Sequence, residues 1–283
     1  MLTHLYLVVL FPALFVMWFA TGIVRMYSPY PAIDSEQKLR SLPPLDWTRC
    51  TVSARAALDA AGIDASSPVS VRSMRLGMLG DRPVWRLADR EQRVHTVFAD
   101  RLAVVPALYS ITGADVAMQF ARATSPQLPA SVHAVYAGML TEPDQWTLEQ
   151  PIPAQLPMLR FDLTDADATR LYVSSAGAEI VTGTTRRGRA LAWLGAIPHW
   201  IYPTLLRRHV REWSWFVIIV ALLGTLMSVT GVAVGLWQWR WRAHRRRDGQ
   251  ALSASPYRDV MMPWHHVTGL VFGAITCTGS SAG

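Results

Sequence analysis

The chain contains very little cysteine, and several familiar catalytic motifs are missing from it. Cys50 and Cys277 are the only cysteines among 283 residues, so a disulfide framework is excluded by number, and no CxxC or Cys/His cluster indicates a zinc site. There is no glycine-rich phosphate loop, no GxSxG and no HExxH, which argues against the nucleotide-binding, hydrolase and protease sites that use them. Of 27 basic residues only Lys38 is a lysine; the net charge is +7, but no recognition motif accompanies it, and we expect no nucleic acid partner.

Formal charge is also missing from two long stretches. Residues 5–24 and residues 213–239 carry none, and about 20 helical residues are enough to cross the roughly 30 Å hydrocarbon core of a bilayer. The first run is longer than the core of a signal peptide, and no basic segment precedes it, so we interpret it as an uncleaved anchor. The sequence therefore predicts transmembrane helices within 1–27 and 213–239, with the lipid bilayer as a partner.

A short arginine-rich loop sets the expected orientation. Six arginines and only two acids lie within 240–263, and the positive-inside rule places such a loop in the cytoplasm. A competing arginine cluster at 207–211 belongs to the long loop 28–212, which the rule exempts. We therefore predict a cytoplasmic basic loop at 240–263 and a large exported domain. The remaining apolar stretch, within 264–283, is short for a span, and we expect an incomplete third transmembrane helix and a tail there.

The large loop contains an internal repeat. RPVWRL at 82–87 resembles LPMLRF at 156–161, and at the same offset of 74 residues the string 97–99 falls on 171–173. Each copy predicts a proline-led strand, a polar turn and a second strand. Such a pair is typical of two small α+β units in tandem.

Helical patterns at 53–61 and 114–123 precede the two copies, and alternation at 69–74 predicts a further strand. The proline-rich segment 125–157 is typical of a linker. We therefore predict an α+β exported domain inserted between transmembrane α-helices, with a first unit at 28–124 and a linker with the second unit at 125–212.

Five short motifs resemble those of one family of bacterial membrane proteins. TG at 21–22 and YSPYP at 27–31 end the first apolar run, GTTRR at 183–187 and WLGAIPHW at 193–200 precede the second, and PWHHVTG at 263–269 opens the third. With these motifs the chain resembles the PepSY-associated transmembrane family, and its repeats resemble PepSY units. The resemblance implies a multi-pass protein of the bacterial inner membrane with the large loop in the periplasm. We expect this chain to depart from the family pattern of about four membrane helices, with an incomplete third helix and without the fourth.

The resemblance implies two different functions. Some members resemble haem-bearing reductases of ferric siderophores, so the leading hypothesis is haem-dependent transmembrane electron transfer linked to ferric siderophore reduction or iron uptake. The PepSY unit itself is proposed to bind or inhibit peptidases. The alternative is therefore a non-enzymatic envelope module whose units bind or regulate a peptidase or another envelope protein. The sequence does not decide between them.

Histidine is the residue type to examine for haem, because imidazoles are strong ligands of haem iron. His4 lies at the inner end of the first helix and His265 and His266 at the inner start of the third, so the predicted topology places them on one side. His199 lies on the outer side, before the second helix. We predict these four as candidate haem ligands, with His4 and His265 or His266 as the site that this chain can complete. Interfacial anchoring beside Trp264, or capping and packing at His199, are the competing interpretations.

Two further patterns have both a structural and a functional interpretation. Small residues on one face of the second helix allow another helix, or a flat macrocycle, to approach closely: Gly224, Ser228, Gly231 and Gly235. Six arginines of the exported domain either attract an anionic ligand such as a ferric siderophore or form the solvated face of strands, and the solvated face is favoured: Arg72, Arg75, Arg82, Arg86, Arg90 and Arg93.

Overall fold

The structure is a computed structural model that describes residues 6, 9, 11–64, 70–149, 152–239 and 261–279. It divides into two compact units. One is Thr21–Arg208, and the other combines Met1–Ala20 with His209–Gly283. The predicted basic loop at 240–263 lies almost entirely outside the described residues, and so does His4.

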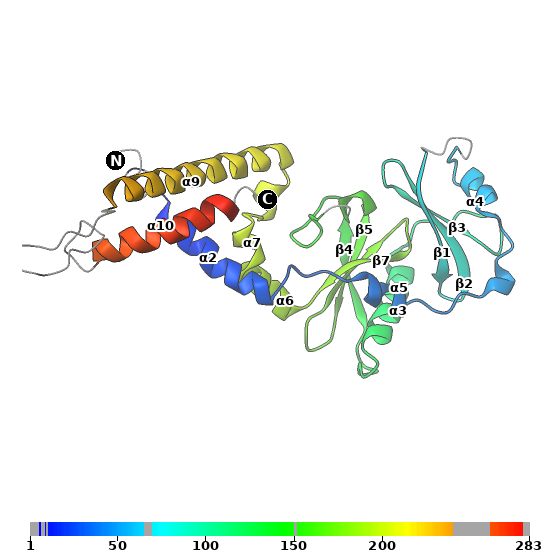
Figure 1. Ribbon diagram of the computed structural model, residues 1–283. Helices are drawn as coiled ribbons and strands as arrows, with labels where there is room; N and C mark the ends of the chain where they lie inside the picture. The colour runs from blue at the N-terminus through cyan, green and yellow to red at the C-terminus, as the bar shows by residue number, and fades with distance from the viewer. Residues whose placement is uncertain are drawn as a thin grey trace, which may run out of the picture. The chain divides into compact units, whose positions relative to one another are not determined.

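The first α+β unit within Thr21–Arg208 is a three-stranded antiparallel meander covered by one helix (Figure 1). The strands are β1 (Val71–Leu79), β2 (Arg82–Asp89) and β3 (Val94–Phe98), and the helix is α4 (Ala54–Ala60). Ser53 caps α4, because its side chain accepts a hydrogen bond from the backbone N–H of Ala56. Ala57 and Leu58 pack on Leu87 and Val97, and this core fixes which face of the sheet the helix covers.

The second α+β unit repeats this order and adds a strand. Helix α5 (Ser110–Thr124) precedes β4 (Ala134–Leu140), β5 (Met158–Leu163), β6 (Arg170–Ser174) and β7 (Glu179–Thr184), which form an antiparallel sheet in that order. Phe120 and Ala121 of α5 pack on Leu159 and Val173. The second core therefore begins at α5, ahead of the predicted boundary at 124, and β4 lies inside the segment that the sequence predicted as a linker.

The two units use their prolines in the same way. The carbonyl of Pro83 accepts a hydrogen bond from the N–H of Ala99 at 2.8 Å, and the carbonyl of Pro157 accepts one from Ser175 at 3.2 Å. The prolines are 74 residues apart, as predicted, but Ala99 and Ser175 are 76 apart. The predicted match of 97–99 with 171–173 is therefore wrong by two residues, because the β5–β6 connection is two residues longer than the β2–β3 connection.

The residues that follow the prolines face the helices. Leu159 is fully buried against α5. Trp85 is half-buried in the core beneath α4, and its indole N–H donates to the carbonyl of Val52 at 2.9 Å. Both side chains thus lie on the helix-covered face that the repeat predicts.

Short helical segments complete the unit Thr21–Arg208. They are α3 (Ser35–Arg40), η1 (Trp47–Arg49), η2 (Ile152–Gln155), α6 (Arg186–Leu194), α7 (Ala196–His199) and α8 (Thr204–Arg207). Gln145 joins the ends of this unit. The side-chain amide of Gln145 donates a hydrogen bond to the carbonyl of Tyr202 and accepts one from the backbone N–H of Thr204. The backbone carbonyl of Gln145 accepts a hydrogen bond from the Tyr30 hydroxyl. Burial raises the pKa of Tyr30, which keeps this hydroxyl a donor.

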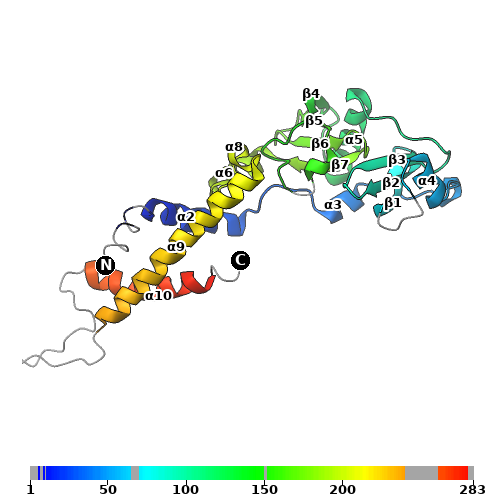
Figure 2. The same ribbon diagram turned by 90° about the horizontal axis from the view of Figure 1, so that it is seen from above.

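The other unit is helical. Figure 2 shows α9 (Val210–Gln238) as the long helix that crosses α10 (Met261–Gly279), and the first part of α2 (Pro12–Tyr27) also belongs here. Among the described residues, α9 is the one helix long and apolar enough to cross a membrane by length and composition, while the apolar helix Ala13–Tyr27 is shorter. Helix α9 begins three residues before the predicted span, and α10 begins three residues before the predicted third stretch.

The small residues of α9 serve helix packing in the described structure. A Cβ added at Gly235 would lie 2.7 Å from Leu270 of α10, and one added at Gly273 would lie 2.9 Å from Val232 of α9. Gly224, at 3.7 Å, faces Phe15. The packing interpretation of this face therefore accounts for these glycines without a macrocycle.

Candidate functional site

The structure describes three of the four candidate histidines, and they belong to different compact units. His4 lies outside the described residues, His199 belongs to the unit Thr21–Arg208, and His265 and His266 belong to the helical unit. The described residues contain no group of three His, Cys, Asp or Glu side chains that could hold a metal ion.

His199 packs against the end of the first apolar run. Its Nδ1 lies 3.5 Å from the hydroxyl oxygen of Thr21, at the outer limit of a hydrogen bond. A Cβ added at Gly22 would lie only 3.1 Å from Cε1 of the imidazole. Two of the motifs that carry the family resemblance thus meet here, and Gly22 leaves the space that the imidazole occupies. This is the packing role that the sequence offered as the competing interpretation.

His266 is buried and engaged by α9. Its Nε2 lies 2.8 Å from the carbonyl oxygen of Gly235, one of the last carbonyls of the helix, which lack a partner within it. The N–H of Trp239 bonds instead to Leu236, and the Trp239 ring stands edge-on to the imidazole at 5.7 Å. Since a carbonyl only accepts, Nε2 of His266 carries a proton and caps α9.

The Nε2 atom of His266 is therefore not available to haem iron in the described structure. Nε2 of His266 cannot bind iron while it donates to Gly235, and the predicted partner His4 lies outside the described residues. His265 is exposed. Haem binding stays a prediction.

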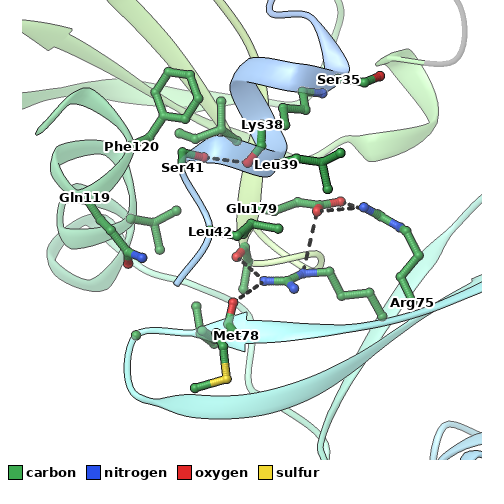
Figure 3. A pocket seen from close by; sticks show the side chains of 16 residues that line it. Ser35, Lys38, Leu39, Ser41, Leu42, Arg75, Met78, Gln119, Phe120 and Glu179 are labelled. Atoms are coloured by element: carbon green, nitrogen blue, oxygen red, sulfur yellow. Dashed lines mark hydrogen bonds and ion pairs between the residues drawn. The ribbon is translucent and has the colours of Figure 1, made fainter. Parts of the chain in front are cut away.

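A second candidate site lies between the two α+β units, and it is built around Arg86 of β2 (Figure 3). This side chain is 4% exposed. Its Nε donates to the carbonyl of Gly177 at 2.8 Å, and its Nη2 donates to the carbonyls of Ala178 at 3.0 Å and Met78 at 3.3 Å. Burial lowers the pKa of Arg86. Gly77 of β1 leaves room for the Arg86 side chain, because a Cβ added at Gly77 would lie 3.1 Å from the guanidinium.

Glu179, at the start of β7, is the carboxylate of this site. Arg75 of β1 binds it with both guanidinium nitrogens, at 2.6 and 3.2 Å. Nε of Arg86 lies 3.6 Å from the same carboxylate. One carboxylate is therefore shared by two arginines that come from neighbouring strands of the other α+β unit.

Lys38 brings a third positive charge to the site. It lies on α3, whose start is fixed by a capping box between Asp34 and Gln37. Its ammonium donates to the carbonyl of Val181 at 2.7 Å. Desolvation lowers the pKa of Lys38; the charge of Arg75 adds to this effect and that of Glu179 opposes it.

These groups line a cleft with a volume of about 230 Å³. Figure 3 shows the Arg75–Glu179 pair on one side of it and Phe120 of α5 on the other. The rest of the wall is mainly apolar and includes Leu39, Leu42, Met78, Leu79, Val116 and Ile180. The cleft thus combines a cationic rim with mainly apolar walls, the kind of lining that is typical of ligand-binding pockets.

The sequence missed this site because it assigned the arginines to a solvated face. That prediction is wrong for Arg86, which is buried. Arg82 is not simply solvated either, because it forms an ion pair with Asp100 at 2.6 Å. The available signal was the string 82–87, in which Arg86 sits among apolar residues on both faces of a strand. A charged side chain in such a strand needs buried partners.

No family model, no curated protein and no solved structure matches this chain. The resemblance to the PepSY-associated family therefore stays a prediction that rests on the motifs themselves.

Proposed function

We propose that this chain is a membrane-anchored, non-enzymatic binding module that holds a segment of another envelope protein in the cleft between its two α+β units. The observation that carries the proposal is the cleft itself: apolar walls, a rim of three cations and one carboxylate, and a joint stabilised by buried Arg86. The donors and acceptors are fixed on strands and on one capped helix, so the site is held in one shape before a ligand arrives.

The apolar surface of α9 supports the membrane anchor. Its 29 residues span roughly 44 Å as a helix, more than the roughly 30 Å core of a bilayer. Large apolar side chains stay exposed along its whole length, from Trp215 to Trp237. Exposed apolar surface of this extent is typical of contact with lipid or with another protein. The arginine-rich stretch after α9 favours a cytoplasmic end there, which would leave the α+β units on the exported side.

Selection of peptides from a displayed library tests the binding function. The full-length protein in detergent would be offered peptides with free and with blocked ends. Wild-type protein should enrich related sequences, and Leu42→Trp should abolish the enrichment, because Leu42 lines the cleft and its side chain would fill it. Leu102→Trp is the matched control, since Leu102 is also exposed but does not line the cleft. Equal enrichment by both variants, or none by the wild type, would contradict the proposal.

Haem-dependent electron transfer to ferric siderophores is the second candidate. The feature in its favour is His265, an exposed imidazole at the start of α10. An absorption spectrum of the purified protein tests it directly, because bound haem gives a Soret band. A spectrum with that band, lost on replacement of His265, would favour this function over the binding module.

A further inference from the structure

The charges around the cleft do not balance. Lys38, Arg75 and Arg86 line it with Glu179 as the only carboxylate among the lining residues. Arg75 and Arg86 share that carboxylate, whereas Lys38 is held by a neutral carbonyl oxygen. An ammonium has three donors and gains most from an anionic acceptor. The described cleft therefore has a surplus of positive charge where an anion would be stabilised.

The apolar wall and the size of the cleft narrow the kind of anion. Leu42, Leu79 and Phe120 place hydrocarbon beside the charged rim, so the favoured ligand carries an apolar group next to its negative charge. The volume of about 230 Å³ is smaller than the roughly 300–1,000 Å³ of pockets that enclose a whole drug-sized ligand. The cleft thus fits one end of a larger molecule.

We propose that the cleft binds the C-terminal residue of a polypeptide, with the terminal carboxylate at Lys38 and an apolar last side chain against α5. This inference rests on the proposed binding function and names its ligand. The bound carboxylate would replace water around the ammonium and balance the surplus positive charge of the rim.

The single lysine of the sequence gives a direct probe. Reductive methylation with ¹³C keeps the positive charge of Lys38 and yields one lysine signal in a spectrum of the full-length protein in detergent. The tripeptide N-acetyl-Ala-Ala-Leu with a free carboxylate should shift this signal in a saturable way. The same tripeptide with a C-terminal amide should leave it in place. Equal shifts from both tripeptides, or no shift from either, would overturn the proposal.

Substitutions separate the role of Lys38 in binding from a role in stability. Lys38→Met should weaken binding of the free-acid tripeptide, measured by calorimetry, about ten- to a hundredfold, because a hydrogen bond to a charged group contributes roughly 1.5–3 kcal/mol. It also removes the donor to the carbonyl of Val181, so a thermal melt of each variant separates lost binding from lost stability. Arg40→Met is the matched control, because it removes a cation from the exposed face of the same helix. Unchanged affinity in Lys38→Met, or an equal loss in both variants, would refute the assignment.

Hexanoate distinguishes the two molecules that could supply such a carboxylate, a polypeptide end and a fatty acid. It carries a carboxylate and an apolar chain but no peptide group, and we expect it to bind more weakly than the tripeptide. Binding of hexanoate as tight as that of the tripeptide would overturn the assignment to a polypeptide end. If library selection yields cleft-dependent peptides that bind without a free C-terminus, the binding function stands and this inference falls.

Discussion

Replacement of Arg86 by methionine should loosen the joint between the two α+β units. The guanidinium donates to three backbone carbonyls, those of Met78, Gly177 and Ala178, and also faces Glu179. Methionine fills part of the same volume but donates no hydrogen bond. The substitution therefore leaves buried acceptors without their donor and an acidic side chain with one arginine instead of two.

The size of the effect follows from these contacts. Hydrogen bonds to a charged group contribute roughly 1.5–3 kcal/mol each but do not add, and removal of one partner from a buried charged network costs about 3–5 kcal/mol. Burial of the apolar methionine side chain offsets part of this cost. We therefore expect the free energy of unfolding to fall by about 3 kcal/mol, the lower end of that range. That corresponds to roughly a hundredfold change in the unfolding equilibrium.

Brief proteolysis across a urea series measures this change on the full-length protein in detergent. Survival of the fragment that contains residues 21–208 reports on the joint without interference from the helical unit. Arg86→Lys should fall between wild type and Arg86→Met, because one ammonium keeps the charge but cannot match the planar fork of the guanidinium. Arg93→Met is the matched control in the connection between β2 and β3, because the Arg93 side chain is 68% exposed and ion pairs of exposed arginines contribute little. Equal midpoints for Arg86→Met and Arg93→Met would refute the reasoning.

Three further outcomes test the rest of the molecule. Reporter fusions after Arg247 should report the cytoplasm and fusions near Gly138 the exported side, because the short arginine-rich loop stays inside; the opposite pattern at both points would reject the topology. His266→Ala should destabilise the packing of α10 on α9 by about 1 kcal/mol or more in a thermal melt, since it removes the donor to Gly235 and leaves a buried space; an unchanged melt would count against the capping role. If the protein binds haem, His4→Ala should abolish the Soret band while His209→Ala leaves it unchanged; a band that persists in His4→Ala would remove the inner site.

Local patterns in the sequence predicted much of the α+β fold. The helical pattern at 53–61 became α4, with Ser53 as its cap, because capping depends on one side chain and the N–H groups next to it. Pro83 and Pro157 mark equivalent strands. The sequence could predict this, because a proline restricts the backbone and removes an N–H donor only in its immediate neighbourhood. The apolar run that became α9 was equally evident, since length and composition alone make it a candidate span.

Pairing partners were decided only by the tertiary structure. Strand β4 was not predicted, because it lies in a proline-rich segment. A long connection separates it from its partner β5, so no tight hairpin turn in the sequence indicates that the two strands pair. The two-residue shift between the repeats depends on the length of the β5–β6 connection, which short matching strings do not record.

The candidate sites show the same division. Composition identified Lys38 as the only lysine and His266 as a histidine at a helix start. The sequence did not reveal that Lys38 faces the neutral carbonyl of Val181 or that His266 caps α9 at Gly235. The role of each side chain depends on which groups from distant parts of the sequence lie next to it in the folded protein. A buried charge is stabilised by the partners that surround it in space, and those partners are set by the packing of helices and sheets.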